Sequence, residues 1–185
     1  MPGPWGDDYT LSRAMAPLRV LSDQHVRDWQ EWISRITTTG FGTVVIAARR
    51  LQSAIAERTS PVDRFVDSVM IWENMFGSGG DVSLRIAASL AWFLGASQLD
   101  RANLYEVTNS LYRLRSQVVH GSAQLSDGDA ATSAEKALNI AIRGLRVLYE
   151  SRPELVSVSA RDRSLCTMLQ ADVSSLRAAQ KSQQR

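Results

Sequence analysis

An arginine and a histidine five positions apart, Arg115 and His120, are the residues of this sequence best suited to chemistry. His120 is one of only two histidines in the chain. An arginine guanidinium can hold a phosphate through two parallel hydrogen bonds, and a histidine can gain or lose a proton near neutral pH. The two groups together fit phosphoryl chemistry, although a pattern of two residues also arises by chance.

The segment that carries these residues has the periodicity of a helix. Apolar side chains recur there at spacings of three and four residues: Leu104, Val107, Leu111, Leu114 and Val118. This spacing defines one apolar helix face. Gly121 is suited to the left-handed conformation just past a helix end. The pattern predicts a helix over residues 101–120 that presents His120 near solvent.

Arg115 and His120 do not point the same way on a regular helix. At the usual helical rotation, five residues separate them by roughly 140°. They converge on one ligand only if the last turn relaxes or if a second copy of the helix comes close. We therefore predict a homodimer whose interface includes this helix.

Composition indicates an ordinary soluble globular protein. The chain has 185 residues, of which 44% are hydrophobic and 22% are charged, enough for one domain with a core or for such a domain with an appendage. The formal net charge is only +2, without a polybasic run, so non-specific coating of DNA is not indicated.

Cysteine usage and the start of the sequence favour a cytoplasmic location. Cys166 is the single cysteine, which excludes an intrachain disulfide and a cysteine-based zinc site. Residues 1–8 do not have the pattern of a signal peptide. No apolar run approaches the roughly 20 residues of a membrane span. We expect no membrane contact, and neither a cofactor nor a metal, because no cluster of carboxylates or histidines is present to hold a catalytic metal.

The N-terminal third predicts an arm followed by helices. Residues 1–16 hold prolines and glycines without a period and predict an irregular arm. Apolar residues at helical spacing begin at Leu18 and predict a helix that a Thr-Thr-Thr-Gly segment interrupts. Residues 43–57 contain Val44, Val45 and Ile46 near their start, which a strand would also use, but their continuation favours a helix.

A helix over residues 61–76 has a strong start signal in Ser60, Pro61 and Asp63. Its buried face is expected to contain Val62, Phe65, Val66, Val69, Trp72 and Phe76. Glu73 borders this face, where an unpaired carboxylate is costly. We predict that Glu73 pairs with Arg115; the alternative is a glutamate that reaches solvent at the edge of the face.

The C-terminal half predicts three further helices besides the one that carries His120. Residues 82–94 should form a helix capped by Asp81, with Leu84 and Phe93 on its buried face. Asp129 should cap a long helix that ends near Glu150. A last helix is expected over residues 160–179, before a frayed tail over residues 180–185.

Residues 61–147 resemble the HEPN superfamily, most closely its ApeA-like branch. Three ordered segments carry the likeness. Residues 66–77, VDSVMIWENMFG, resemble the family's acidic helix, and residues 84–94, LRIAASLAWFL, resemble its second helix. Residues 111–121, LYRLRSQVVHG, resemble the family's string of Leu-Tyr, Arg-Ser and Val-His-Gly. This last string is much more specific than an arginine and a histidine alone.

The resemblance implies an all-α fold built on a HEPN-like helical bundle that dimerises. We assign that bundle to residues 59–151, an N-terminal arm and helices packing on it to residues 1–58, and a C-terminal helix and tail to residues 152–185. In active members the family implies a metal-independent endoribonuclease of toxin or phage-defence systems, with RNA as substrate and an antitoxin or sensor as a possible partner.

By the same resemblance, Arg115 and His120 carry catalysis and Glu73 supports them. His120 is the candidate acid or base, and Arg115 is the candidate phosphate clamp. Ser116 and Tyr112 are candidate substrate-binding residues, because they share a helix face with His120 at intervals of four.

Two alternatives stay open on the sequence alone. Some family members are inactive modules for dimerisation or RNA binding, because a fold does not settle an activity. On that alternative, Arg115 only closes the core with Glu73, and His120 only caps a helix end.

Overall fold

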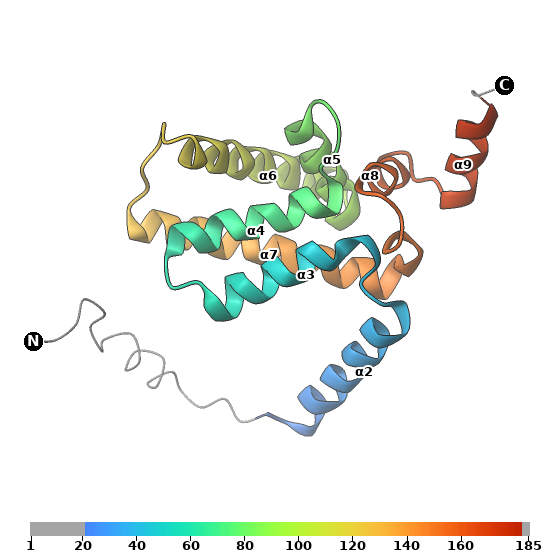
Figure 1. The fold of residues 1–185 in the computed structure, drawn as a ribbon, viewed down its shortest axis with the longest axis horizontal. Coiled ribbons are helices and arrows are strands. Elements are labelled where there is room, and N and C mark those ends of the chain that lie inside the picture. Colours follow the sequence, from blue (N-terminus) through green and yellow to red (C-terminus); the bar gives the residue numbers. More distant parts are fainter. Residues whose placement is uncertain (1–20, 183–185) are drawn as a thin grey trace, which may run out of the picture. The chain divides into compact units, whose positions relative to one another are not determined.

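The computed structural model describes residues 21–182, which fold as helices with no strand among them (Figure 1). The all-α fold class is therefore confirmed. The irregular arm predicted for residues 1–16, the first residues of the helix expected from Leu18 and residues 183–185 of the tail lie outside this range. Within the described range, no helix has both the length and the apolar composition needed to cross a membrane.

The chain divides into two compact units, with the boundary between Ser34 and Arg35. The first unit contains most of α2 (Asp23–Thr39), in which no residue is buried. The apolar stripe of α2 includes Trp29, which is 65% exposed.

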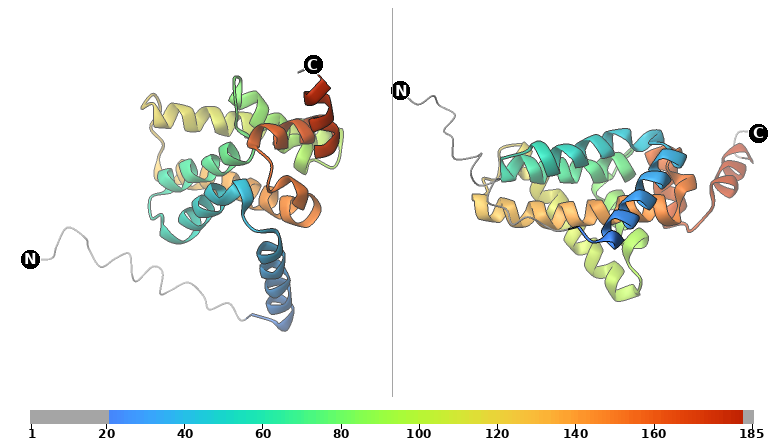
Figure 2. Two further views of the ribbon diagram at one scale, coloured as in Figure 1. Left: turned by 45° about the vertical axis from the view of Figure 1, so that its right-hand side comes forward. Right: turned by 90° about the horizontal axis from the view of Figure 1, so that it is seen from below.

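The second unit contains the candidate site. Its elements are η1 (Gly42–Val44), α3 (Val45–Gln52), the π-helical η2 (Ser53–Glu57), α4 (Pro61–Phe76), α5 (Val82–Leu94), α6 (Gln98–Val119), α7 (Asp127–Ser151), η3 (Pro153–Leu155), α8 (Ala160–Met168) and α9 (Val173–Ser182). Helix α4 is central, because it packs against α3, α5, α6, α7 and α8. Figures 1 and 2 show α3, α4 and α7 side by side. The predicted segments 1–58, 59–151 and 152–185 each contribute at least one helix to this unit.

Helix α4 begins as its start signal predicts. The Ser60 side chain accepts a hydrogen bond from the Asp63 backbone N–H, and Pro61 occupies the first turn. Phe65, Val69, Trp72 and Phe76 are fully buried. Removing a large apolar side chain from water contributes about 1.5–3 kcal/mol, so this face anchors the core. Val62 and Val66, predicted on the same face, are only partly buried.

One predicted helix cap is right in position only, and another is wrong. Asp81 is the N-cap residue of α5, as predicted, but it has a left-handed backbone, with φ of 52°, and its side chain makes no capping hydrogen bond. Helix α7 begins at Asp127 rather than at Asp129, because the Ser126 side chain accepts from the Asp129 backbone N–H. Asp129 therefore lies within the first turn, where a negative charge still complements the helix dipole.

The bounds of two other helices also differ from the predictions. Helix α6 begins at Gln98 rather than at residue 101, because Ser97 and Asp100 form a reciprocal capping box. The single helix predicted over residues 160–179 is divided into α8 and α9. Gln170 has a positive φ of 51°, which interrupts helical geometry for a non-glycine residue.

The apolar faces predicted for α5 and α6 are only partly covered. Leu84 and Val107, expected in the core, are exposed, and Phe93 is half-buried, with its ring edge against Phe76 at 5.5 Å between centroids. Helix α6 packs mainly on α5 and less on α4 and α7. Part of its apolar face is consequently left without a neighbour in the described chain.

Candidate functional site

His120 terminates α6 in a regular backbone motif. Gly121 has the predicted positive φ of 71°. Its N–H donates to the Val118 carbonyl at 3.1 Å, and the Ser122 N–H donates to the Gln117 carbonyl at 2.9 Å. These two hydrogen bonds define a Schellman motif. His120 is exposed at this helix end, as the sequence predicts.

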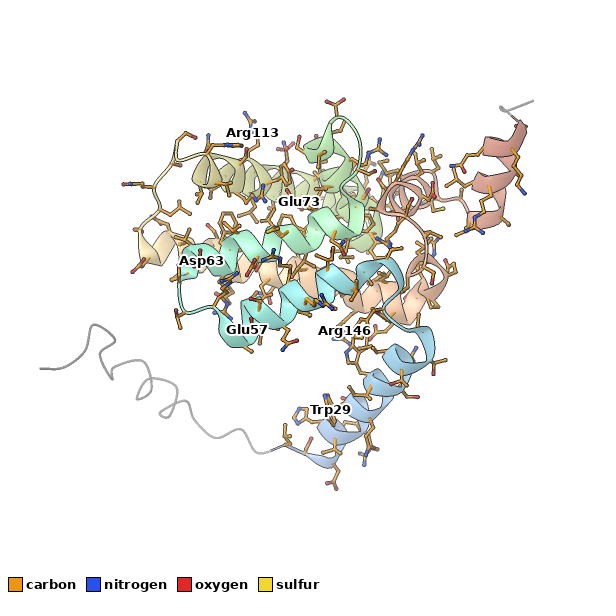
Figure 3. The ribbon with its side chains drawn as sticks, in the orientation of Figure 1. Trp29, Glu57, Asp63, Glu73, Arg113 and Arg146 are labelled. Atoms are coloured by element: carbon orange, nitrogen blue, oxygen red, sulfur yellow. The ribbon has the colours of Figure 1, made fainter. Side chains whose placement is uncertain are left out.

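The predicted ion pair between Glu73 and Arg115 is present. Arg115 Nη1 lies 3.2 Å from Glu73 Oε1, and Nη2 donates to Oε2 at 3.3 Å. The contact is therefore bidentate, and it joins α4 to α6; Figure 3 labels Glu73 on α4. The side chains are 18% and 26% exposed, respectively, so the pair is open enough to water that a ligand can compete for the guanidinium.

Tyr112 is a third member of this cluster. Burial raises the pKa of its phenol above the ordinary value, and the charge of Glu73 and a hydrogen bond with that carboxylate raise it further, whereas Arg115 lowers it. The phenol is therefore protonated at neutral pH and can act as a hydrogen-bond donor. Glu73 thus organises both Arg115 and Tyr112.

Arg115 and His120 are not brought together within one chain. Helix α6 is regular through Val119, so the angular separation of roughly 140° between them persists. The Arg115 guanidinium is directed to Glu73, whereas no side chain of residues 21–182 hydrogen-bonds to the His120 ring. Ser116 is half-buried, and its carbonyl accepts the His120 backbone N–H at 3.0 Å.

The side chains predicted to bind substrate follow one side of the helix. Tyr112, Ser116 and His120 succeed one another at intervals of four residues, which aligns them along the surface of a regular helix. Exposure increases along this row, from the half-buried Tyr112 and Ser116 to the exposed His120. The row can therefore present a hydroxyl, a second hydroxyl and an imidazole to one extended ligand.

Two surface hollows of the second unit lie away from this row. One of about 450 Å³ is lined by residues of α3 and η2, including Ile46, Arg49 and Glu57. Another of about 350 Å³ lies at the α5–α6 turn and is lined by Leu94, Asn103 and Arg143 among others. Neither hollow is lined by Glu73, Arg115 or His120.

Arg85 on α5 has an unusual environment that no sequence motif indicated. Its Nε and Nη1 atoms are buried without a hydrogen-bond partner in the described chain, as are Arg115 Nε and the Thr108 hydroxyl. These groups belong to α5 and α6, the same helix pair that carries the candidate site. One sequence signal was available, because Arg85 is the only charged residue of the helix 82–94.

No metal centre is formed by the side chains of residues 21–182, among which no three His, Cys, Asp or Glu residues are grouped suitably for one. Comparisons of the chain with protein-family models, curated proteins and solved structures found no match. The HEPN likeness therefore rests on the sequence strings described above, and the family assignment stays a prediction.

Proposed function

We propose that this protein is a metal-independent endoribonuclease of the HEPN type, acting as a toxin or phage-defence effector. The observation that carries the proposal is the cluster on α4 and α6: Glu73 holds Arg115 bidentately and engages Tyr112, on the helix that ends at an exposed His120. A cation, hydroxyl groups and a titratable imidazole are the groups that phosphoryl transfer from RNA uses.

The chemistry draws its nucleophile from the substrate. The RNA 2′-oxygen attacks the adjacent phosphorus, and the bond from phosphorus to the 5′-oxygen breaks. This leaves a 2′,3′-cyclic phosphate and a 5′-hydroxyl. His120 removes the proton from the 2′-hydroxyl or supplies one to the departing 5′-oxygen. Arg115 stabilises the negative charge that develops on the phosphate oxygens, while Tyr112 and Ser116 donate hydrogen bonds to it.

Two chains complete the site in this proposal. Since Arg115 and His120 diverge on a single helix, the α6 helices of a homodimer bring His120 of one copy to the Arg115 cluster of the other. A two-fold interface repeats each contact and produces one composite cleft. The uncovered apolar side chains of α6, such as Val107, are available to such an interface. Light scattering that shows a monomer at micromolar concentration would contradict this arrangement.

The decisive experiment is cleavage of labelled single-stranded RNA by the purified protein in the presence of EDTA. We expect His120→Ala and Arg115→Ala each to lose about 10²–10⁴-fold of the rate, with normal folding. RNA with methylated 2′-hydroxyls and DNA should be inert, because both lack the nucleophile. Matched controls are His25→Ala, which removes the other histidine, and Arg113→Ala, which removes an exposed arginine of the same helix.

Several outcomes would reject this mechanism. Activity that EDTA abolishes would show that a metal takes part. Equal cleavage of methylated RNA would show that the 2′-hydroxyl is not the nucleophile. His25→Ala losing as much rate as His120→Ala would show that the effect does not belong to the end of α6.

A second candidate function is a non-catalytic module for dimerisation or for binding RNA or a partner protein. The specific observation that favours it is the bidentate contact of Glu73 with Arg115 Nη1 and Nη2, which a phosphate must displace before it can bind those two atoms. A wild-type dimer that binds varied RNAs without cleaving them, with no inhibitor co-purified, would support this function. The partner in a regulated effector would be an antitoxin or a sensor protein.

A further inference from the structure

A row of planar and polar side chains runs along one side of α6, from the start of the helix to the proposed catalytic cluster, whose Tyr112 and Ser116 are its last members. Arg101, Tyr105, Tyr112 and Ser116 lie four, seven and four positions apart, which places them within an arc of roughly 60° on a regular helix. All four are half-buried. From Arg101 to Ser116 the row is roughly 22 Å long.

A stacked pair lies at the far end of this row. The Arg101 guanidinium carbon lies 4.1 Å from the centroid of the Trp92 ring, and Trp92 is 40% exposed. Arg101 Nε donates to the Gly95 carbonyl at 3.1 Å, which fixes the guanidinium over the indole. A Cβ atom added at Gly95 would lie 2.6 Å from Arg101 Cγ, so a glycine is needed there to seat the arginine.

Such a row matches the way proteins bind single strands. Bases stack on aromatic rings and on arginine planes, and this stacking tolerates any base sequence. A duplex, by contrast, presents its phosphates and has its bases stacked internally, and it is bound chiefly by clustered positive charge. The row contains two tyrosines and one tryptophan–arginine stack but no cluster of basic residues, so it favours unpaired bases.

We propose that Trp92, Arg101, Tyr105, Tyr112 and Ser116, hereafter the α6 track, bind single-stranded RNA through stacking of its unpaired bases. The inference rests on the proposed function, because the track leads to the cluster around Arg115. Arg101 precedes Arg115 by 14 residues of continuous helix, or roughly 21 Å. A strand that occupies both ends must therefore be several nucleotides long, and a free mononucleotide reaches only one end.

The test is fluorescence anisotropy with a labelled, 2′-O-methylated RNA of about twelve nucleotides, which cannot be cleaved through its 2′-oxygen. Loss of one stacking ring in Trp92→Ala or Tyr105→Ala should weaken binding roughly 5- to 150-fold. Trp92→Phe and Tyr105→Phe keep a ring and should bind nearly as the wild type does. Trp29→Ala is the matched control, because it removes an exposed tryptophan from α2. Circular dichroism verifies that each variant is folded.

The second arm uses ligands too short to span the track. A methylated dinucleotide that binds only at the Arg115 end should have the same affinity for Trp92→Ala as for the wild type. Mononucleotide that competes as well as the long RNA, at equal concentration, would show that the stack is a nucleotide pocket and would overturn the RNA track. Unchanged affinity of the long RNA for both alanine variants, or no binding to the wild type, would also overturn it.

Failure of the track and failure of the proposed function give different results. If the wild type cleaves RNA while Trp92→Ala and Tyr105→Ala cleave with unchanged KM, the nuclease stands and the track is rejected. If the wild type binds the methylated RNA in a ring-dependent way but cleaves no RNA, the track stands and the nuclease is rejected.

Discussion

Two arginines of the second unit, Arg115 and Arg163, differ in their burial and in the groups that accept their hydrogen bonds. Arg115 lies at a partly open surface, where a bidentate carboxylate balances its charge. Arg163 is fully buried, and no carboxylate of residues 21–182 pairs with it. Neutral oxygens surround it instead: Nη1 donates to the Met75 carbonyl at 2.6 Å, Nη2 to the Thr43 hydroxyl at 2.6 Å and Nε to the Leu155 carbonyl at 2.9 Å.

The difference indicates what each arginine can do. Burial lowers the pKa of Arg163 to about 10, which leaves it protonated at neutral pH. Its hydrogen bonds tie the end of α4, the turn at Thr43 and the segment after α7 together, so it cannot be released to a ligand without unfolding. Arg115 has one partner and access to water, and a phosphate can replace that partner. The two arginines thus differ in the acceptors of their hydrogen bonds and in their access to solvent.

Substitution of Arg163 should have the largest effect on stability. Arg163→Met preserves volume but leaves the buried carbonyls of Met75 and Leu155 without a donor, whereas the Val158 carbonyl keeps the Thr43 hydroxyl. Losses of this kind cost about 3–5 kcal/mol in the free energy of unfolding, measured by urea denaturation. Arg161→Met, an exposed position of the same helix, should stay within about 0.5 kcal/mol. A loss at Arg163 no larger than at Arg161 would refute the structural role.

Substitution of Asp67 should cause the second-largest loss of stability. Its buried carboxylate, 3% exposed, accepts from Arg50 at 2.7 Å and from Arg58 at 2.6 Å. Asp67→Asn places a neutral amide between two cations and should cost about 1–3 kcal/mol, less than a fully buried pair, because both arginines remain about one-third exposed and can be hydrated. The measurement is again urea denaturation, with the exposed Glu135→Gln of α7 as control. Equal urea midpoints for Asp67→Asn and Glu135→Gln would contradict a stabilising role of the Asp67 carboxylate.

The contrast between these charged groups also explains which parts of the molecule the sequence predicts. Two local signals succeed: the helix start at Ser60 and Pro61 and the left-handed Gly121 each depend on neighbours a few positions away. Glu73 and Arg115 were predictable as a pair, because each borders an apolar face and a carboxylate needs a cation. Their partnership follows from charge type and helix periodicity together.

Arg163 and Asp67 escaped prediction for a physical reason. Arg163 donates to Met75, 88 positions away, and to Thr43, 120 positions away, and backbone carbonyls have no residue-type signature. Asp67 lies within an apolar run, where its two arginines come from a different helical segment. The exposed Leu84 and Val107 were misplaced for the related reason that helix periodicity defines a face but not the neighbour that covers it.

Glu73→Gln should have a smaller effect on stability than Asp67→Asn and a specific effect on Tyr112. The pair with Arg115 is partly exposed, so we expect a loss of about 0.5–1 kcal/mol. The pKa of Tyr112 should fall toward its ordinary value, because the charge of Glu73 and its hydrogen bond raise it in the wild type. Alkaline absorbance titration measures this change, and Tyr112→Phe identifies the phenol.

The sign of the pH effect follows from the raised pKa. A phenol whose folded pKa exceeds its unfolded value stabilises the protein below the unfolded pKa, near 10, and this contribution is lost as the pH rises through the folded value. The wild type should therefore lose more stability above about pH 10 than Tyr112→Phe does. Equal alkaline profiles for the two proteins would show that burial and Glu73 together do not raise the pKa of Tyr112 in the folded protein.

His120 should have the smallest effect on stability of all. Its ring is exposed and has no hydrogen-bond partner among residues 21–182, and the Schellman motif around it uses backbone groups alone. His120→Ala should therefore change the free energy of unfolding by less than about 0.5 kcal/mol. The neighbouring Gly121→Ala is the matched contrast, because a left-handed backbone costs an alanine about 1–2 kcal/mol. If urea denaturation instead gives His120→Ala the larger loss, the imidazole is a structural cap, and a loss of cleavage in that variant could no longer be assigned to proton transfer.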